Sequence, residues 1–108
     1  MYKVKRSPIH GRGLFATTKI ARGTPIGVYE GPQTNRDSTY VLWVTGDDGI
    51  ERGILGQNAL RFVNHSTSPN AEFAGPELVS LKTIQPGAEI TCHYGEEWEG
   101  MPLARQEA

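Results

Sequence analysis

A compact polar segment between two apolar runs carries the side chains best suited to chemistry. Residues 61–70 read Arg-Phe-Val-Asn-His-Ser-Thr-Ser-Pro-Asn, so amide, imidazole and hydroxyl groups crowd together. Such groups are costly to bury without hydrogen-bond partners. Phe62 and Val63 can anchor the backbone in a core. Composition alone favours a simpler interpretation, a turn in which the polar side chains satisfy their own backbone.

The single cysteine offers a second kind of chemistry. Cys92 could act as the nucleophile of a thiol hydrolase with His65 or His93. One cysteine on an apolar strand is more often a small core residue, and neighbouring strand residues point to opposite faces. A zinc site built from His10 and these three residues has no recognised ligand spacing. Both interpretations are weak on the sequence alone.

Two glycines near the start suggest a ligand loop. Residues 11–16, Gly-Arg-Gly-Leu-Phe-Ala, fit the Gly-x-Gly-x-x-Ala form of the dinucleotide fingerprint. That fingerprint must open a helix about three turns long, whereas residues 17–22 are followed at once by Gly23 and Pro25. The dinucleotide interpretation therefore fails. Without Cβ atoms, Gly11 and Gly13 still let the backbone turn sharply and approach a ligand or another segment closely.

Composition limits the function classes. A chain of 108 residues fits one domain. Its net charge of −1 and pI near 6.3 give no basic surplus for nucleic acid. No apolar run reaches the length of a membrane span, one cysteine excludes an internal disulfide, and no signal peptide is recognisable. We expect a soluble protein that stays in the compartment where it is made.

Short strands and turns must position these groups. Thirteen Gly and seven Pro punctuate the chain and disfavour long helices. An Asp-Gly pair at 48–49 indicates a hairpin, residues 33–38 form a polar loop, and residues 57–60 are expected to form one helical turn. The pattern predicts an antiparallel, mainly β domain. Strands are expected at residues 2–5, 26–30, 39–44, 71–73, 78–81 and 90–94.

With these segments in order, the chain resembles a SET domain, the fold of S-adenosylmethionine-dependent protein lysine methyltransferases. Four blocks match the family pattern in sequence order: residues 11–16, residues 29–31 (Tyr-Glu-Gly), residues 61–66 with Pro69 and Asn70, and residues 84–95 ending Glu-Ile-Thr-Cys-His-Tyr-Gly. The third block is highly specific, and the four together span roughly residues 8–98. The resemblance implies a mainly β SET-domain β-clip of short antiparallel strands, with a threaded C-terminal segment and little helix. It implies one domain over residues 1–100 and a frayed tail over 101–108.

The resemblance also assigns roles to matching residues. Tyr94 is implied as the active-site tyrosine, assisted by Tyr29, and family threading would bring Tyr94 beside Asn64. The channel for the target lysine would be lined by Tyr29, Tyr40 and Cys92. The implied cofactor is S-adenosylmethionine, and the residues expected to bind it are Gly11, Arg12, Gly13, Arg61, Asn64, His65 and Trp98.

Several positions depart from the family pattern. Thr67 stands where many members have a zinc-binding cysteine, which implies an enzyme without zinc. Cys92 occupies a position where the family commonly has Phe or Tyr, and His93 replaces Asp or Asn. A smaller residue leaves space, so we expect higher methylation states. Gln57 replaces a family glycine, and residues 46–56 are short for the insert that shapes the substrate groove. A pared-down, stand-alone SET protein of bacterial or viral style is the nearest likeness, and a second subunit could complete its groove as a homodimer.

The sequence therefore predicts a protein-lysine methyltransferase, with a SET-fold binding module that transfers no methyl group as the alternative. Its expected partner is a protein or peptide that presents a lysine, without nucleic acid or membrane. Glu96, Glu97 and Glu99 could attract a basic segment or simply form a solvated surface. Trp98 could cover the cofactor's adenine or the lysine channel, or serve as a hydrophobic plug. We expect a cytoplasmic protein, or a nuclear or nucleoid-associated one if the substrate is a chromatin protein.

Overall fold

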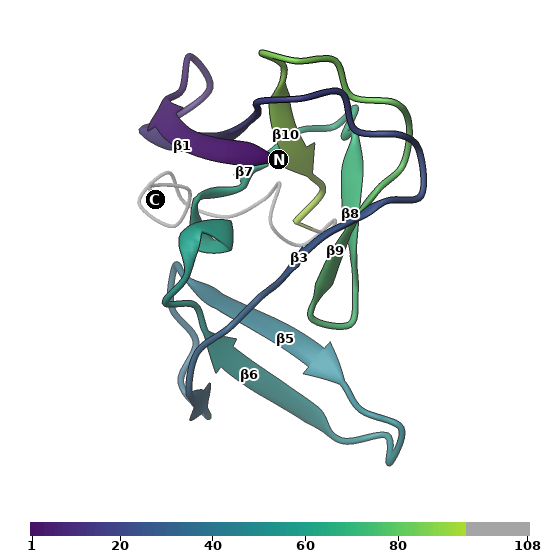
Figure 1. The fold of residues 1–108 in the computed structure, drawn as a ribbon. Helices are drawn as coiled ribbons and strands as arrows, with labels where there is room; N and C mark the ends of the chain where they lie inside the picture. Colours follow the sequence, from purple (N-terminus) through teal and green to yellow (C-terminus); the bar gives the residue numbers. More distant parts are fainter. Residues whose placement is uncertain (95–108) are drawn as a thin grey trace.

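Short strands dominate the computed structural model, which describes residues 1–94 (Figure 1). The prediction of a mainly β chain with little helix is confirmed. The elements are β1 (Tyr2–Arg6), β2 (Arg12–Ala16), β3 (Pro25–Val28), β4 (Gln33–Thr34), β5 (Val41–Thr45), β6 (Glu51–Leu55), the 3-10 helix η1 (Ala59–Phe62), β7 (Asn64–His65), β8 (Ala71–Ala74), β9 (Glu77–Ser80) and β10 (Glu89–Cys92). In this part of the chain no helix is long and apolar enough to cross a membrane.

One four-stranded sheet joins the two ends of the described chain. Its strand order is β1-β2-β10-β7. β10 pairs antiparallel with β2, where Ile90 lies opposite Leu14, and parallel with β7, where Thr91 lies opposite Asn64. A late strand therefore lies between the N-terminal hairpin and the polar segment of residues 61–70, and Figure 1 shows β10 beside β7.

Two antiparallel sheets of three strands each complete the fold. Their orders are β3-β9-β8 and β4-β6-β5. The predicted hairpin at Asp48 and Gly49 connects β5 to β6, and Gly49 has the positive φ of +78° that such a turn needs. The polar loop predicted for residues 33–38 instead begins with β4, which pairs with β6. Two residues are too few to show the alternation by which strands are recognised.

The hydrophobic core draws on all the larger elements. Strands β2 and β10 contribute Leu14 and Ile90, β9 contributes Leu78, and η1 contributes Leu60; none of the four is exposed to solvent. Burial of such side chains supplies most of the favourable free energy of folding. The core cluster therefore fixes β10 and η1, the elements on either side of the polar segment, in relation to one another.

Most predicted strand boundaries are off by one or two residues, and two of the differences bear on the polar segment and Tyr94. The helical turn expected at 57–60 is shifted to Ala59–Phe62, because the Asn58 side chain bonds β3 instead: its Nδ2 donates to the Val28 carbonyl oxygen at 2.7 Å. The last strand ends at Cys92, so Tyr94 lies beyond it. Residues 95–108, which include the predicted tail, the acidic run and Trp98, lie outside the described residues.

Candidate functional site

Asn64 is the centre of a buried polar junction. Asn64 is only 3% exposed to solvent. Its Nδ2 donates to the carbonyl oxygens of His10 at 3.0 Å and Arg12 at 3.1 Å, and to Glu89 Oε2 at 2.9 Å. One amide group therefore ties the loop before β2 to β7 and β10. The polar segment is more than a self-contained turn, because Asn64 finds its partners 25 to 54 residues away.

The two glycines of the N-terminal block serve different needs. Gly11 has a φ of +45°, a backbone conformation that favours glycine. A Cβ there would meet no atom within 4 Å, so glycine is needed for its backbone conformation and not for its small size. At Gly13 a Cβ would lie 2.3 Å from Glu89 Oε2 and 3.1 Å from Asn64 Nδ2. Gly13 is therefore packed against the junction, whereas Gly11, in the loop, and Arg12, the first residue of β2, are exposed beside it.

Tyr94 contacts the polar segment directly. Its backbone N–H donates to His65 Nδ1 at 3.0 Å, and its phenol hydroxyl donates to the Val63 carbonyl oxygen. The rings of Tyr94 and His65 lie 5.3 Å apart. Because Nδ1 accepts a hydrogen bond, a neutral His65 carries its proton on Nε2. Residues 29 positions apart in sequence thus meet at one place.

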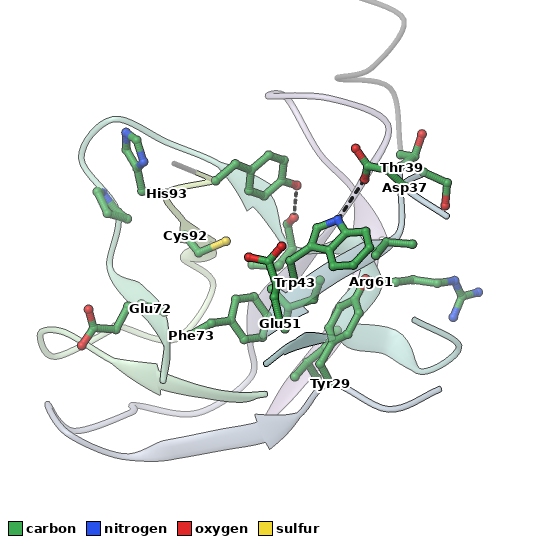
Figure 2. Close-up of a pocket in the computed structure, with 18 of the residues that line it drawn as sticks. Tyr29, Asp37, Thr39, Trp43, Glu51, Arg61, Glu72, Phe73, Cys92 and His93 are labelled. Atoms are coloured by element: carbon green, nitrogen blue, oxygen red, sulfur yellow. Dashed lines mark hydrogen bonds between the residues drawn. The ribbon is translucent and has the colours of Figure 1, made fainter. Parts of the chain in front are cut away.

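A cavity of about 690 Å³ opens beside this contact. Tyr94, Cys92 and Tyr29 contribute to its wall, together with Phe73 from β8. Figure 2 shows the labelled rings of Tyr29, Phe73 and Trp43 around it. The cavity is therefore bounded by aromatic side chains and by the segment from Cys92 to Tyr94. Its exposed lining residues include three carboxylates, those of Asp37, Glu51 and Glu72.

Tyr29 is a rigid part of this wall. The residue is 7% exposed, and its hydroxyl donates to the Tyr40 carbonyl oxygen at 2.6 Å. Its ring and that of Phe73 form a T-shaped pair with a centroid distance of 5.6 Å. Burial raises the pKa of the Tyr29 phenol to about 12. Tyr40 does not line the cavity: it supplies this carbonyl, and its ring packs against Phe62.

Arg61 forms hydrogen bonds with the residues just before η1. Its guanidinium donates to the carbonyl oxygens of Gln57 at 3.0 Å and Asn58 at 2.9 Å, and lies 4.2 Å from the centroid of the Phe62 ring. These contacts fix the end of η1 at one side of the cavity. Among the residues predicted to hold a cofactor, the structure brings Arg12 and Gly13 against Asn64, next to Gly11, whereas the His65 ring contacts Tyr94 and His93 and Arg61 bonds the residues before η1. Trp98 is outside the described residues.

Cys92 is a buried thiol rather than a nucleophile. The residue is 1% exposed, and burial raises its pKa to about 12, so the thiol stays protonated at neutral pH. A cysteine nucleophile needs the thiolate. His65 instead packs against the His93 ring at 4.7 Å. Residues 1–94 hold no group of three or more His, Cys, Asp or Glu side chains arranged to bind a metal ion.

These raised pKa values predict a loss of stability in alkali. Cys92 and Tyr29 have ordinary values of 9.0 and 10.0, and burial raises both to about 12. The unfolded chain therefore loses these protons first, so the stabilisation is complete below about pH 9 and is lost as pH rises toward 12. Urea unfolding at a series of pH values should show a flat free energy of unfolding that falls above pH 9. In Cys92→Ala the fall should begin nearer pH 10; an unchanged onset would contradict the assignment to the thiol.

Sequence reasoning missed two polar members of the junction, Ser7 and Glu89. The Ser7 Oγ lies 2.7 Å and 2.8 Å from the two carboxylate oxygens of Glu89. Glu89 stands inside the closing sequence block at 84–95, which was the available signal. Ser7 gave none, because a serine before a proline resembles an ordinary strand terminator.

Comparisons with known proteins agree on one family. A family model described as SET domain matches residues 11–95. The chain is similar to the histone-lysine N-methyltransferase trithorax of Drosophila virilis, with 30% identity over 84% of this chain, and to the histone-lysine N-methyltransferase 2B of Homo sapiens, also with 30% identity over 84%. It spans 3% and 4% of the lengths of these two relatives.

Solved structures show the same fold. The methyltransferase domain of human histone-lysine N-methyltransferase SETMAR superposes with a TM-score of 0.76 at 22% identity, covering 92% of this chain and 46% of that one. The methyltransferase domain of human PR domain-containing protein 2 gives a TM-score of 0.69 at 21% identity, covering 94% and 80%. At these identities the likeness concerns the fold alone.

Proposed function

Since the chain belongs to the SET-domain family, we propose that it transfers a methyl group from S-adenosylmethionine to a lysine side chain of a protein. The observation that carries this proposal is the contact of Tyr94 with residues 63–65 at the wall of a cavity. Tyr94 contacts Val63 and His65, and Asn64 between them holds the carbonyl oxygens of His10 and Arg12, so three distant parts of the sequence are linked through residues 63–65.

The residues around Asn64 fit a cofactor site. Gly11 and Arg12 are exposed, the Arg12 carbonyl oxygen accepts from the buried amide of Asn64, and nothing within 4 Å fills the space where a Gly11 side chain would stand. Backbone N–H and C=O groups of such a loop suit the polar groups of an amino-acid moiety. We therefore assign Gly11, Arg12, Gly13, Asn64 and His65 to this site. When bound, S-adenosylmethionine supplies an activated methyl group on a sulfonium.

Neither tyrosine serves as a base. Burial raises the pKa of Tyr94 above its ordinary value and that of Tyr29 to about 12, so both phenols keep their protons at neutral pH. Both hydrogens are already donated to backbone carbonyls, which directs the oxygen lone pairs elsewhere. Tyr94 therefore orients the lysine amine as an acceptor. A half-buried wall that penalises charge keeps that amine neutral and able to attack.

The cavity suits an extended, basic polypeptide. β5 and β8 are edge strands of their sheets within the described residues, and both contribute residues to the cavity wall. A peptide laid along an edge strand can gain main-chain hydrogen bonds. The exposed carboxylates of Asp37, Glu51 and Glu72 favour basic side chains beside the target lysine. The proposed partner is accordingly a lysine-bearing protein segment with Lys or Arg neighbours.

Calorimetry and mass spectrometry together test this function. Titration of the protein with S-adenosylmethionine measures cofactor binding. Incubation with deuterium-labelled cofactor and lysine peptides with basic or acidic neighbours then measures transfer. Labelled methyl-lysine, formed faster on the basic peptides, is expected. Binding without transfer to any peptide or lysate protein would select the binding module instead.

The size of the Cys92 side chain predicts the product state. Its wall position beside Tyr29 and Phe73 leaves more room than an aromatic residue would. We expect dimethyl-lysine and trimethyl-lysine to accumulate when the cofactor is saturating. Mass spectrometry of one peptide over time checks this, with a peptide in which the target lysine is replaced by arginine as the blank. Accumulation of monomethyl-lysine alone would contradict the prediction.

A further inference from the structure

Glu89 binds three segments of the chain through one carboxylate. Both of its oxygens accept from Ser7 Oγ, at 2.7 Å and 2.8 Å, and Oε2 also accepts from Asn64 Nδ2 at 2.9 Å. Glu89 opens β10, so the carboxylate is attached to the strand that carries the chain on to Tyr94. Hydrogen bonds to an ionised carboxylate are stronger than those between neutral groups.

Ser7 extends this network into the exposed loop. The residue is 8% exposed, its Oγ accepts from the Ile9 N–H at 3.0 Å, and its own N–H donates to the Gly11 carbonyl oxygen at 2.8 Å. The loop from Ser7 to Gly13 therefore closes on itself through Ser7 and is fastened to the sheet through Glu89. Its other attachment is Asn64, which holds the carbonyls of His10 and Arg12.

Gly13 shows how closely the carboxylate is fitted. A Cβ there would stand 2.3 Å from Oε2, so the backbone of β2 lies directly against the carboxylate. The same carboxylate also sets the direction of the Asn64 amide. The loop, through Ser7, and Asn64 thus both donate hydrogen bonds to Glu89, which lines no part of the cavity.

We infer that Glu89 is a positioning residue that holds the loop of residues 7–13 and the Asn64 amide in the arrangement that binds S-adenosylmethionine. The inference rests on the proposed function. Glu89 acts on cofactor affinity through Asn64 and the loop, and it has no part in binding the lysine or in the chemical step.

The variant Glu89→Gln tests this with two independent readouts. Glutamine keeps the length of the side chain but replaces one acceptor oxygen by a donor nitrogen, which faces the Ser7 hydroxyl or the Asn64 amide. We expect the Kd and KM for S-adenosylmethionine to rise about 10-fold to 100-fold. The KM for the lysine peptide and kcat at saturating cofactor should stay near wild-type values. In the protein without ligand, amide hydrogen exchange over residues 7–13 should become at least about 10-fold faster.

Matched variants separate positioning from general destabilisation. Glu77→Gln is the control, because Glu77 likewise opens a four-residue strand, β9, is half-buried, and lines no part of the cavity. It should leave both readouts unchanged. Ser7→Ala removes one partner of the carboxylate while Glu89 remains, and guards against misfolding of Glu89→Gln. Its effects should be similar in kind, and the double variant should be less impaired than the two single effects combined.

The two readouts distinguish failure of the inference from failure of the proposed function. If the wild-type protein does not bind S-adenosylmethionine, the proposed function is wrong and the inference fails with it, even if Glu89→Gln loses protection of the loop. If the wild type binds the cofactor and Glu89→Gln binds it equally well, the inference is wrong and the proposed function stands. A rise in the KM for the peptide alone would also overturn it.

Discussion

Replacing Tyr94 by phenylalanine should lower kcat for lysine methylation by about 100-fold or more, the usual cost of removing one well-placed hydrogen-bonding group from a reacting centre. The phenol is held by the Val63 carbonyl oxygen on one side and sits at the wall of the cavity on the other. Phenylalanine keeps the ring that packs near His65 but leaves that carbonyl without its donor and the amine without its acceptor. Rates of labelled methyl transfer to a basic lysine peptide measure the effect.

Affinity for the cofactor should change little in Tyr94→Phe, because the glycine loop and Asn64 do not depend on the phenol. Tyr2→Phe is the matched control, since Tyr2 lies on the edge strand β1 and lines no part of the cavity. It should transfer methyl groups at the wild-type rate. Equal rates for Tyr94→Phe and the wild type would show that the phenol has no part in the reaction.

The polar segment shows what could be predicted from sequence. Residue types and order indicated a site at 61–70, and the resemblance indicated which late strand would meet it. Composition also favoured a local turn, and that interpretation holds for Ser66, whose Oγ accepts from the Ser68 N–H at 3.0 Å. Asn70 instead brackets β10, accepting from the Thr91 N–H and donating to the Glu89 carbonyl oxygen, both at 2.8 Å. Local hydrogen bonding therefore accounts for the Ser66 side chain. The partners of Asn64 and Asn70 depend on strands that are distant in sequence.

Contacts between distant residues explain what sequence could not supply. Ser7 and Glu89 are 82 residues apart, and neither has a neighbour in sequence that indicates the partnership. The family resemblance implied that Tyr40 lines the channel, whereas its ring packs on Phe62 and its carbonyl holds Tyr29. A residue's type predicts which groups it can offer, but the backbone decides whether the side chain or the carbonyl is used.

Gly56 is a position where one added methyl group should be costly. A Cβ there would lie 2.4 Å from the Tyr29 hydroxyl oxygen and 2.5 Å from its Cζ. The ring cannot give way cheaply, because its hydroxyl is bonded to the Tyr40 carbonyl and it packs perpendicular to the Phe73 ring. The Gly56 N–H donates to that same carbonyl at 2.9 Å, so the backbone is fixed as well. Gly56→Ala should destabilise the fold by about 1–3 kcal/mol.

The matched control for that substitution is Gly46→Ala. A Cβ at Gly46 would come within 2.8 Å of an Arg52 guanidinium nitrogen and 3.0 Å of Asp48 Oδ1, the ends of two exposed side chains whose ion pair can shift together. Both glycines have ordinary negative φ values, so the two variants differ in the stiffness of the neighbour rather than in backbone strain. Thermal unfolding should show a fall in Tm of several degrees for Gly56→Ala and little change for Gly46→Ala. Because Tyr29 forms part of the cavity wall, the rate of methyl transfer should fall in Gly56→Ala even at temperatures where the variant remains folded. A destabilised variant with full activity would mean that the position of Tyr29 does not matter to the reaction.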